Sequence, residues 1–172
     1  MTVEARFEES SVRARLGTFP TPVEVCGPLW VKRDDLNATV CGGNKVRALE
    51  FLLGAVAPGD TVVTLGARGS THVLATAVHA ARLGARTIAY TWPQVLNPTA
   101  IAVSQEIQAR CFRVVPTVHA LAALALYTLH RGARCYVPIG GTSPLGILGH
   151  IEAGRELAEQ IREGLLPTPE TV

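Results

Sequence analysis

From residue 60 onward, short apolar runs alternate regularly with longer segments that have helical periodicity. The runs TVVTL (61–65), TIAYT (87–91), CFRVVP (111–116) and RCYVP (134–138) are typical of buried strands. Helices are expected between and after them, at 71–84, 97–111, 117–132 and 143–164. This βα alternation predicts an α/β fold: a parallel sheet with right-handed crossovers, covered by helices.

Capping residues mark the ends of these predicted helices. Asn97 and Ser143 each precede a proline, which favours them as N-caps, and Thr117 is expected to cap the third helix. Gly84 and Gly132 occupy positions typical of glycines that end a helix.

The first sixty residues are organised differently. LWVKRDDL (29–36) is typical of a strand that runs into a turn. NKVRALEFLLGAV (44–56) predicts an amphipathic helix. Its apolar stripe consists of Val46, Leu49, Leu52, Leu53 and Val56.

Composition favours a folded protein and excludes several classes of partner. Hydrophobic residues make up 48% of the 172 residues, and the net charge of +2 comes from scattered side chains. We therefore expect no binding to nucleic acid or to a membrane. The start of the chain lacks the apolar core of a signal peptide, so a cytoplasmic protein is expected. The four cysteines have no metal-ligand spacing and are expected to be reduced and packed, with no metal bound.

Three glycine-containing loops carry polar groups: GGNK (42–45), GARGSTH (66–72) and IGGTS (139–143). The last two follow predicted strands, and ligands of parallel α/β sheets bind at such loops. Ser70, Thr71 and free backbone N–H groups are suited to holding a carboxylate. An ordinary helix cap explains GARGSTH equally well, and ordinary turns and caps are the stronger interpretation of GGNK and IGGTS taken alone.

Lys45 is one of two lysines among the 16 basic residues. The positive end of a helix dipole disfavours the charged form of a lysine at a helix start, and a neutral lysine can form a Schiff base. Arginine cannot do so, because it stays protonated. The alternative is a solvated lysine in the first turn of the helix.

Taken together, KRDDL, GGNKVRALEFLL, GARGSTH and GGTSPLGILGHIEAGRELAEQ resemble one family of pyridoxal-phosphate enzymes, that of D-cysteine desulfhydrase and 1-aminocyclopropane-1-carboxylate deaminase. The resemblance extends from about residue 21 to residue 160. It implies the tryptophan synthase β-like fold (fold type II) and pyridoxal 5'-phosphate as cofactor. It also implies a lyase or deaminase activity on a small amino acid.

The same resemblance implies roles for single residues. Lys45 matches the lysine that carries the cofactor as a Schiff base, and Asn44 is its cofactor-binding neighbour. Ser70 matches a catalytic serine that contacts the substrate carboxylate or takes part in proton movement. His72 and Thr142 match substrate-binding positions.

Thr71 is a departure from the family pattern. The family's loop usually reads GGVQSNH, with an asparagine that contacts the phenolic oxygen of the cofactor. The resemblance gives Thr71 this cofactor contact and a substrate contact, through a hydroxyl that is shorter than an amide.

Members of this family are about twice as long as this chain. The resemblance implies that residues 1–59 begin the larger cofactor domain, that 60–142 form the complete smaller domain, and that 143–172 return to the larger one. The remaining half would supply the glycine-rich phosphate loop. We expect the stripe of the 44–56 helix and one face of the 144–164 helix to lack cover. The chain would then pair with a second chain, form a homo-oligomer, or be a truncated relative.

Two other classes of function stay open. The first is a non-catalytic relative or split subunit that serves as a binding or assembly module. The second is a nucleotide-binding Rossmann domain, which fits the βαβ rhythm but not the glycine spacing, since Gly66 and Gly69 give GxxG in place of GxGxxG.

Overall fold

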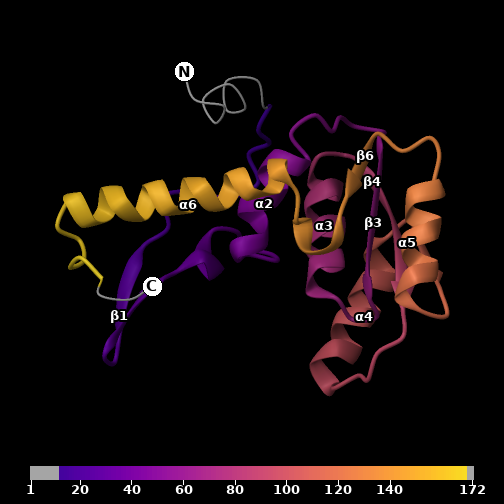
Figure 1. Ribbon diagram of the computed structural model, residues 1–172, viewed down its shortest axis with the longest axis horizontal. Coiled ribbons are helices and arrows are strands. Elements are labelled where there is room, and N and C mark those ends of the chain that lie inside the picture. The colour runs from indigo at the N-terminus through magenta and orange to yellow at the C-terminus, as the bar shows by residue number, and fades with distance from the viewer. Residues whose placement is uncertain (1–11, 170–172) are drawn as a thin grey trace.

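A four-stranded parallel sheet forms one end of the computed structural model, which describes residues 12–169 (Figure 1). The strand order is β5-β4-β3-β6. The strands are β3 (Thr61–Ala67), β4 (Arg86–Trp92), β5 (Arg113–Pro116) and β6 (Cys135–Val137). The predicted parallel α/β architecture is confirmed.

Helices cover both faces of this sheet (Figure 1). Two of them, α3 (Thr71–Arg82) and α4 (Pro98–Arg110), pack against each other on one face, and α5 (Ala120–Leu129) packs against β3 and β4 on the other. The β3 strand is buried along most of its length because it lies between two strands and two helical layers.

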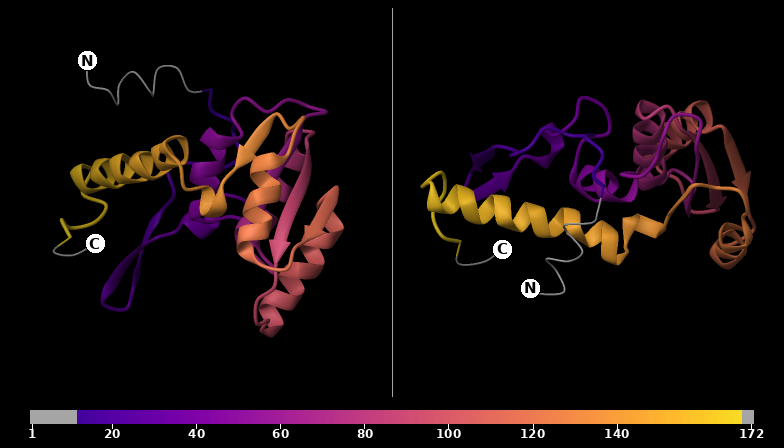
Figure 2. Two further views of the ribbon diagram at one scale, coloured as in Figure 1. Left: turned by 45° about the vertical axis from the view of Figure 1, so that its right-hand side comes forward. Right: turned by 90° about the horizontal axis from the view of Figure 1, so that it is seen from above.

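The rest of the described chain lies to one side of the sheet. An antiparallel hairpin of β1 (Val23–Cys26) and β2 (Leu29–Lys32) runs beside the long helix α6 (Pro144–Arg162), as Figure 2 shows. Between this part and the sheet lie η1 (Asp34–Leu36), α2 (Asn44–Leu52) and η2 (Ile139–Gly141). In residues 12–169 we find no helix that is long and apolar enough to span a membrane.

Two predicted helix caps are confirmed. The Asn97 side chain accepts a hydrogen bond from the backbone N–H of Ala100 at 2.8 Å, at the start of α4. The Ser143 hydroxyl accepts one from Gly146 at 3.0 Å, at the start of α6. Each satisfies a backbone donor that has no partner within its own helix.

The predicted cap at Thr117 is wrong. The α5 helix begins at Ala120, and Nδ1 of His119 accepts the hydrogen bond from the N–H of Ala122 at 3.1 Å. The Thr117 hydroxyl donates to the carbonyl oxygen of Thr91 at 3.0 Å instead. The Thr117 hydroxyl therefore joins the ends of β4 and β5, and the helix starts two residues later than expected.

The expectation that the apolar stripe of α2 lacks cover is also wrong. Val46, Leu49 and Leu53 are fully buried, because α2 packs against α6 and against the sheet layer. The two helices cross at Gly149, where an added Cβ would lie 2.2 Å from the carbonyl oxygen of Arg47. Only a residue without a side chain permits this approach, so α6 provides the cover that we expected from elsewhere.

One hydrophobic core joins α2 to the sheet. Leu49 and Leu53 belong to the same buried cluster as Val62 of β3 and Val137 of β6. The division into domains at residues 59 and 142 stays a prediction. Within this chain the helix that carries Lys45 is fixed to the sheet by shared packing.

Candidate functional site

Lys45 lies half-buried in the first turn of α2, after a loop with special backbone geometry. Gly43 has φ +126° and Cys41 has φ +53°, so both lie in the left-handed region. The amide of the buried Asn37 donates to the Gly43 carbonyl at 3.0 Å and accepts from its N–H at 3.1 Å. Nε2 of the buried His79 lies 3.3 Å from the Cys41 carbonyl oxygen. These contacts hold the loop that positions Lys45.

The face of α2 that carries Lys45 meets the other two glycine loops. Ala48 and Leu52 follow Lys45 at helical spacing, so the three side chains lie on one side of α2. A Cβ added to Gly141 in η2 would lie 3.3 Å from Leu52, 3.5 Å from Ala48 and 3.7 Å from the ring of His72. The structure thus brings Gly141 of the IGGTS motif and His72 of the GARGSTH motif against the helix that follows GGNK.

His72 is buried at this meeting point, with 6% of its surface exposed. Its Nε2 lies 3.0 Å from the carbonyl oxygen of Pro138. A carbonyl only accepts, so Nε2 carries the hydrogen and Nδ1 presents a lone pair. Within the described chain this buried Nδ1 has no hydrogen-bond partner.

The charge state of His72 follows from its surroundings. Burial lowers its pKa, the hydrogen bond to Pro138 opposes this, and the positive charge of Lys45 lowers the pKa further. His72 is therefore a neutral hydrogen-bond acceptor at pH 7.

Ser70 and Thr71 begin α3. The Ser70 hydroxyl caps the helix by accepting from the N–H of Val73 at 3.4 Å. The Ser70 side chain packs against Gly66, because a Cβ added to Gly66 would lie 2.9 Å from Ser70 Oγ. Thr71 is exposed at the first helical position. Both residues lie on the loop that leads to His72.

Asn44 and Thr142 lie at the edges of this region. Asn44 is the exposed first residue of α2. Thr142 is exposed and ends η2, with its backbone N–H donating to the Ile139 carbonyl at 3.2 Å. The roles that the resemblance implies for these two side chains stay predictions.

A buried charge network behind α2 was missed in the sequence. The Arg47 guanidinium donates to Asp34 at 2.7 Å and to Glu156 at 2.8 Å. Lys32 donates to Glu156 at 2.6 Å and to the Thr21 carbonyl at 3.1 Å. The network joins η1, α2 and α6, so the KRDD segment fixes the helix that carries Lys45.

The signal for this network lies in KRDD itself, because its charges need partners once the strand packs. Burial alone would raise the pKa of Glu156, but hydrogen bonds from Arg47 and Lys32 outweigh it and lower the pKa to about 2. Burial would likewise raise the pKa of Asp34, but hydrogen bonds from Arg47 and Thr21 outweigh it and lower the pKa. Both carboxylates are therefore charged at neutral pH.

No cluster of three or more histidine, cysteine, aspartate or glutamate side chains suited to a metal ion occurs in residues 12–169. The four cysteines are free thiols.

These observations define an α/β protein with a lysine-bearing site at the loops between parallel strands and helices. The sequence profile of one family, described as "Pyridoxal-phosphate dependent enzyme", matches residues 15–172. The chain belongs to this family, and the cofactor of the family is pyridoxal phosphate.

Similar proteins include enzymes of differing activity. A nocardicin C-9' epimerase of Nocardia uniformis subsp. tsuyamanensis is 42% identical, over 91% of this chain and 53% of the relative. A D-cysteine desulfhydrase of Salmonella paratyphi B is 34% identical, over 88% of this chain and 52% of the relative. The crystal structure of an ACC deaminase homologue is 27% identical with a TM-score of 0.69, over 93% of this chain and 55% of that structure. The chain thus spans about half the length of the relatives that it matches.

The residues at the site fit the reactive end of pyridoxal phosphate. Lys45 offers the primary amine that reacts with an aldehyde, and the Nδ1 atom of His72 is a buried acceptor without a partner. Gly141 leaves no side chain between α2 and the imidazole. The cofactor, when bound, acts as an electron sink for a bond at the α-carbon of an amino acid.

Proposed function

We propose that this chain supplies Lys45 and the amino-acid-binding loops of a pyridoxal-phosphate-dependent lyase or deaminase for a small amino acid. The observation that carries this proposal is the meeting of the Lys45 face of α2 with Gly141 and the buried, neutral His72. The membership of the family supports the cofactor, and the D-cysteine desulfhydrase relative supports the reaction class.

Within this proposal each side chain has a defined task. Lys45 holds the cofactor covalently and, once released, moves a proton at the substrate α-carbon. Ser70 and the free N–H groups at the start of α3 bind the substrate carboxylate. His72 lies beside that carboxylate, and its unpaired Nδ1 is available to accept a hydrogen bond from the substrate.

The remaining assignments concern the rim of the site. Asn44 and Thr71 contact the cofactor, and Thr71 and Thr142 contact the substrate. Because Thr71 is exposed, its hydroxyl is free to turn toward either group.

The test is an assay of the complete protein with D-cysteine and with 1-aminocyclopropane-1-carboxylate, following release of ammonia and a 2-oxo acid. Lys45→Arg keeps the charge but cannot form the Schiff base, so it should abolish turnover. His150→Gln, at an exposed position of α6, is the control that should leave turnover unchanged. Turnover that survives Lys45→Arg would refute the proposal.

Epimerisation at the α-carbon is a second candidate function. The epimerase relative is 42% identical to this chain. An epimerase removes a proton from one face of a carbon with a base and returns a proton to the other face from an acid. The unpaired Nδ1 of His72 can act as the base and a protonated Lys45 amine as the acid.

Turnover in deuterium oxide distinguishes these two reactions. An epimerase returns substrate that carries deuterium at the α-carbon, with inverted configuration and no ammonia. A lyase or deaminase releases ammonia and a 2-oxo acid.

We also propose that a further polypeptide segment completes the protein, as a second chain or as a second copy of this one. The match to about half of each relative supports this. So does the apolar surface of the β1–β2 hairpin, where Val25 and Leu29 are largely exposed. A groove of about 650 Å³ runs between this hairpin and the end of α6, lined by Trp30 and Leu166 among others.

Size-exclusion chromatography of the purified chain tests this assembly. A monomer that stays in solution without a partner would count against both forms of assembly and favour the alternative, a truncated binding module. An absorbance band of lysine-bound cofactor from the isolated chain would argue against a non-catalytic module. We place the protein in the cytoplasm, where its four free cysteines would stay reduced.

A further inference from the structure

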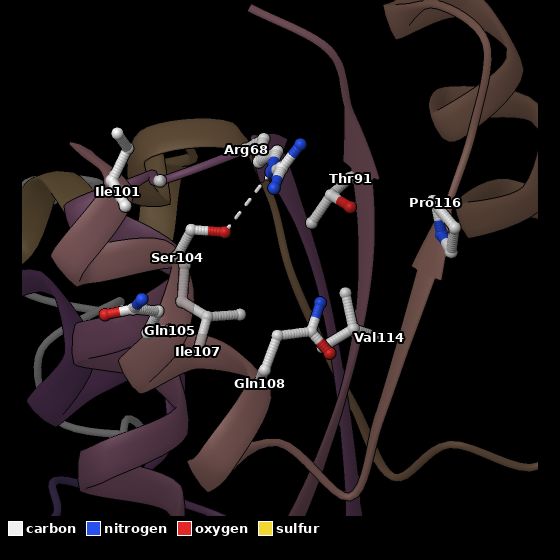
Figure 3. A pocket seen from close by; sticks show the side chains of 10 residues that line it. Arg68, Thr91, Ile101, Ser104, Gln105, Ile107, Gln108, Val114 and Pro116 are labelled. Carbon is white, nitrogen blue, oxygen red and sulfur yellow. Dashed lines mark hydrogen bonds between the residues drawn. The ribbon is translucent and has the colours of Figure 1, made fainter. Parts of the chain in front are cut away.

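A cavity lies beside Arg68 and Gly69 of the 66–72 loop, and His72 does not line it. Its volume is about 290 Å³, and it opens between α4 and the ends of β4 and β5 (Figure 3). His72 contacts Pro138, which follows β6, whereas this cavity is lined by Thr91 of β4 and by Val114 of β5. In the order β5-β4-β3-β6 these are opposite sides of β3, so the cavity is separate from the Lys45 site.

Polar groups converge on this cavity. Figure 3 shows the Ser104 hydroxyl directed toward Arg68, and the Gln108 side chain reaching into the space between α4 and the strands. Thr91 and Ser104 are 7% and 8% exposed, so their hydroxyls belong to the wall and not to the open surface. A buried hydroxyl gains from a ligand that uses it.

Arg68 is the only charged group among the residues that line the cavity. Its Nε lies 3.5 Å from Ser104 Oγ, at the outer limit of a hydrogen bond. No carboxylate of residues 12–169 lies within ion-pair distance of it. The guanidinium is therefore available to an anion from solution.

The rest of the lining is apolar and sets the kind of anion. Ile101, Ile107, Val114 and Pro116 form the walls beside the polar groups. Arginine binds carboxylate and phosphate alike, but these apolar walls favour an anion with an alkyl chain over inorganic phosphate, which has no apolar part to bury. The volume is at the lower end of that of ligand pockets, which suits an acid of roughly four to six carbons.

The cavity shares its wall with the loop that carries Ser70. Gly69 lines the cavity with φ +80°, and a Cβ added there would lie 2.5 Å from the carbonyl oxygen of Ala100 in α4. The helix and the loop therefore touch through backbone atoms, and Ser70 is the next residue. A ligand held between Arg68 and α4 would fix the loop at this contact.

We propose that this cavity binds a small aliphatic monocarboxylate, with the carboxylate on Arg68 and Ser104 and the alkyl chain against Ile107 and Val114. The site is independent of pyridoxal phosphate, and its ligand is not the amino acid that reacts at Lys45. Its existence does not depend on the proposed function.

Isothermal titration of the complete protein with butyrate tests this proposal, in parallel with butylamine and inorganic phosphate. Butyrate should bind at millimolar concentration or below, and butylamine should not bind. Arg68→Gln should weaken butyrate binding about tenfold or more, because a charge-assisted hydrogen bond is lost. Arg131→Gln, at an exposed arginine outside the cavity, is the control that should leave binding unchanged.

A second variant keeps the test valid if Arg68→Gln perturbs folding. Ile101→Trp fills the cavity from a partly exposed position and should abolish binding while Lys45 chemistry persists. No binding of butyrate, or binding that neither variant weakens, would overturn the proposal. Phosphate binding that is as tight and as dependent on Arg68 would overturn the assignment to a monocarboxylate.

Discussion

Replacing Glu156 with glutamine removes one of the two carboxylates that hold Arg47 and the start of α2. Glu156 is 13% exposed, and its pKa falls from 4.5 to about 2 in the folded chain. At about 1.4 kcal/mol for each pH unit, the charged carboxylate contributes about 3 kcal/mol to folding at neutral pH. We therefore expect Glu156→Gln to lower the free energy of unfolding by about 3 kcal/mol at pH 7.

The pH dependence of this loss makes the prediction specific. The pKa of Glu156 is lowered by folding, so its contribution is complete above pH 4.5 and disappears as the pH falls through 2. Urea unfolding of wild type and variant should therefore show a difference near pH 3 that is less than half of the difference at pH 7. Glu159→Gln, which removes an exposed ion pair with Arg162, should cost about 0.5 kcal/mol or less. A loss below about 1 kcal/mol at pH 7, or a loss that does not vary with pH, would refute the reasoning.

Three further predictions concern packing, capping and thiol reactivity. Leu49→Ala should lower the free energy of unfolding by about 2–5 kcal/mol, measured in urea, because Leu49 is fully buried where α2 meets the sheet. A loss of about 0.5 kcal/mol or less, which is typical of a surface substitution, would contradict the shared core. Ser143→Ala should cost about 1 kcal/mol in the same assay through the lost cap of α6, and an unchanged midpoint would show that the cap is replaced. Burial raises the pKa of Cys111 and of Cys135 to about 11, so both should react with iodoacetamide at pH 8 more slowly than the exposed Cys26, and unfolding should remove the difference.

The alternating pattern after residue 60 was sufficient to predict the sheet and its helices. Hydrophobic periodicity and helix-capping residues are local signals, so β3, α3 and α6 begin where the sequence predicts them. The start of α5 was missed for a tertiary reason. The Thr117 hydroxyl binds the Thr91 carbonyl across the sheet, and a propensity for capping cannot report such a competitor.

The cover of α2 could not be predicted from sequence either. It depends on Gly149, which lets α6 approach the α2 backbone, and on the ion pair of Arg47 in α2 with Glu156 in α6, which also binds Lys32 of β2. These contacts join residues more than a hundred positions apart. A stripe pattern shows that a face needs a partner but does not identify the partner.

The candidate site was predicted in part. Lys45, His72 and the IGGTS loop were each selected on local chemistry, and the structure brings His72 and Gly141 of that loop against Ala48 and Leu52 of the helix that carries Lys45 in its first turn. The residues that support the site, Asn37 and His79, carry no motif. They were not selected because their partners are backbone groups, the N–H and carbonyl of Gly43 for Asn37 and the carbonyl of Cys41 for His79.

Borohydride reduction of the complete protein with pyridoxal phosphate tests the central claim most directly. The sequence contains only two lysines, Lys32 and Lys45, and Lys32 is engaged by Glu156. Peptide mapping should therefore find the reduced cofactor on the peptide that contains Lys45, and Lys45→Arg should abolish the label. A label on Lys32, or no label in the complete protein, would contradict the assignment of Lys45 as the cofactor lysine.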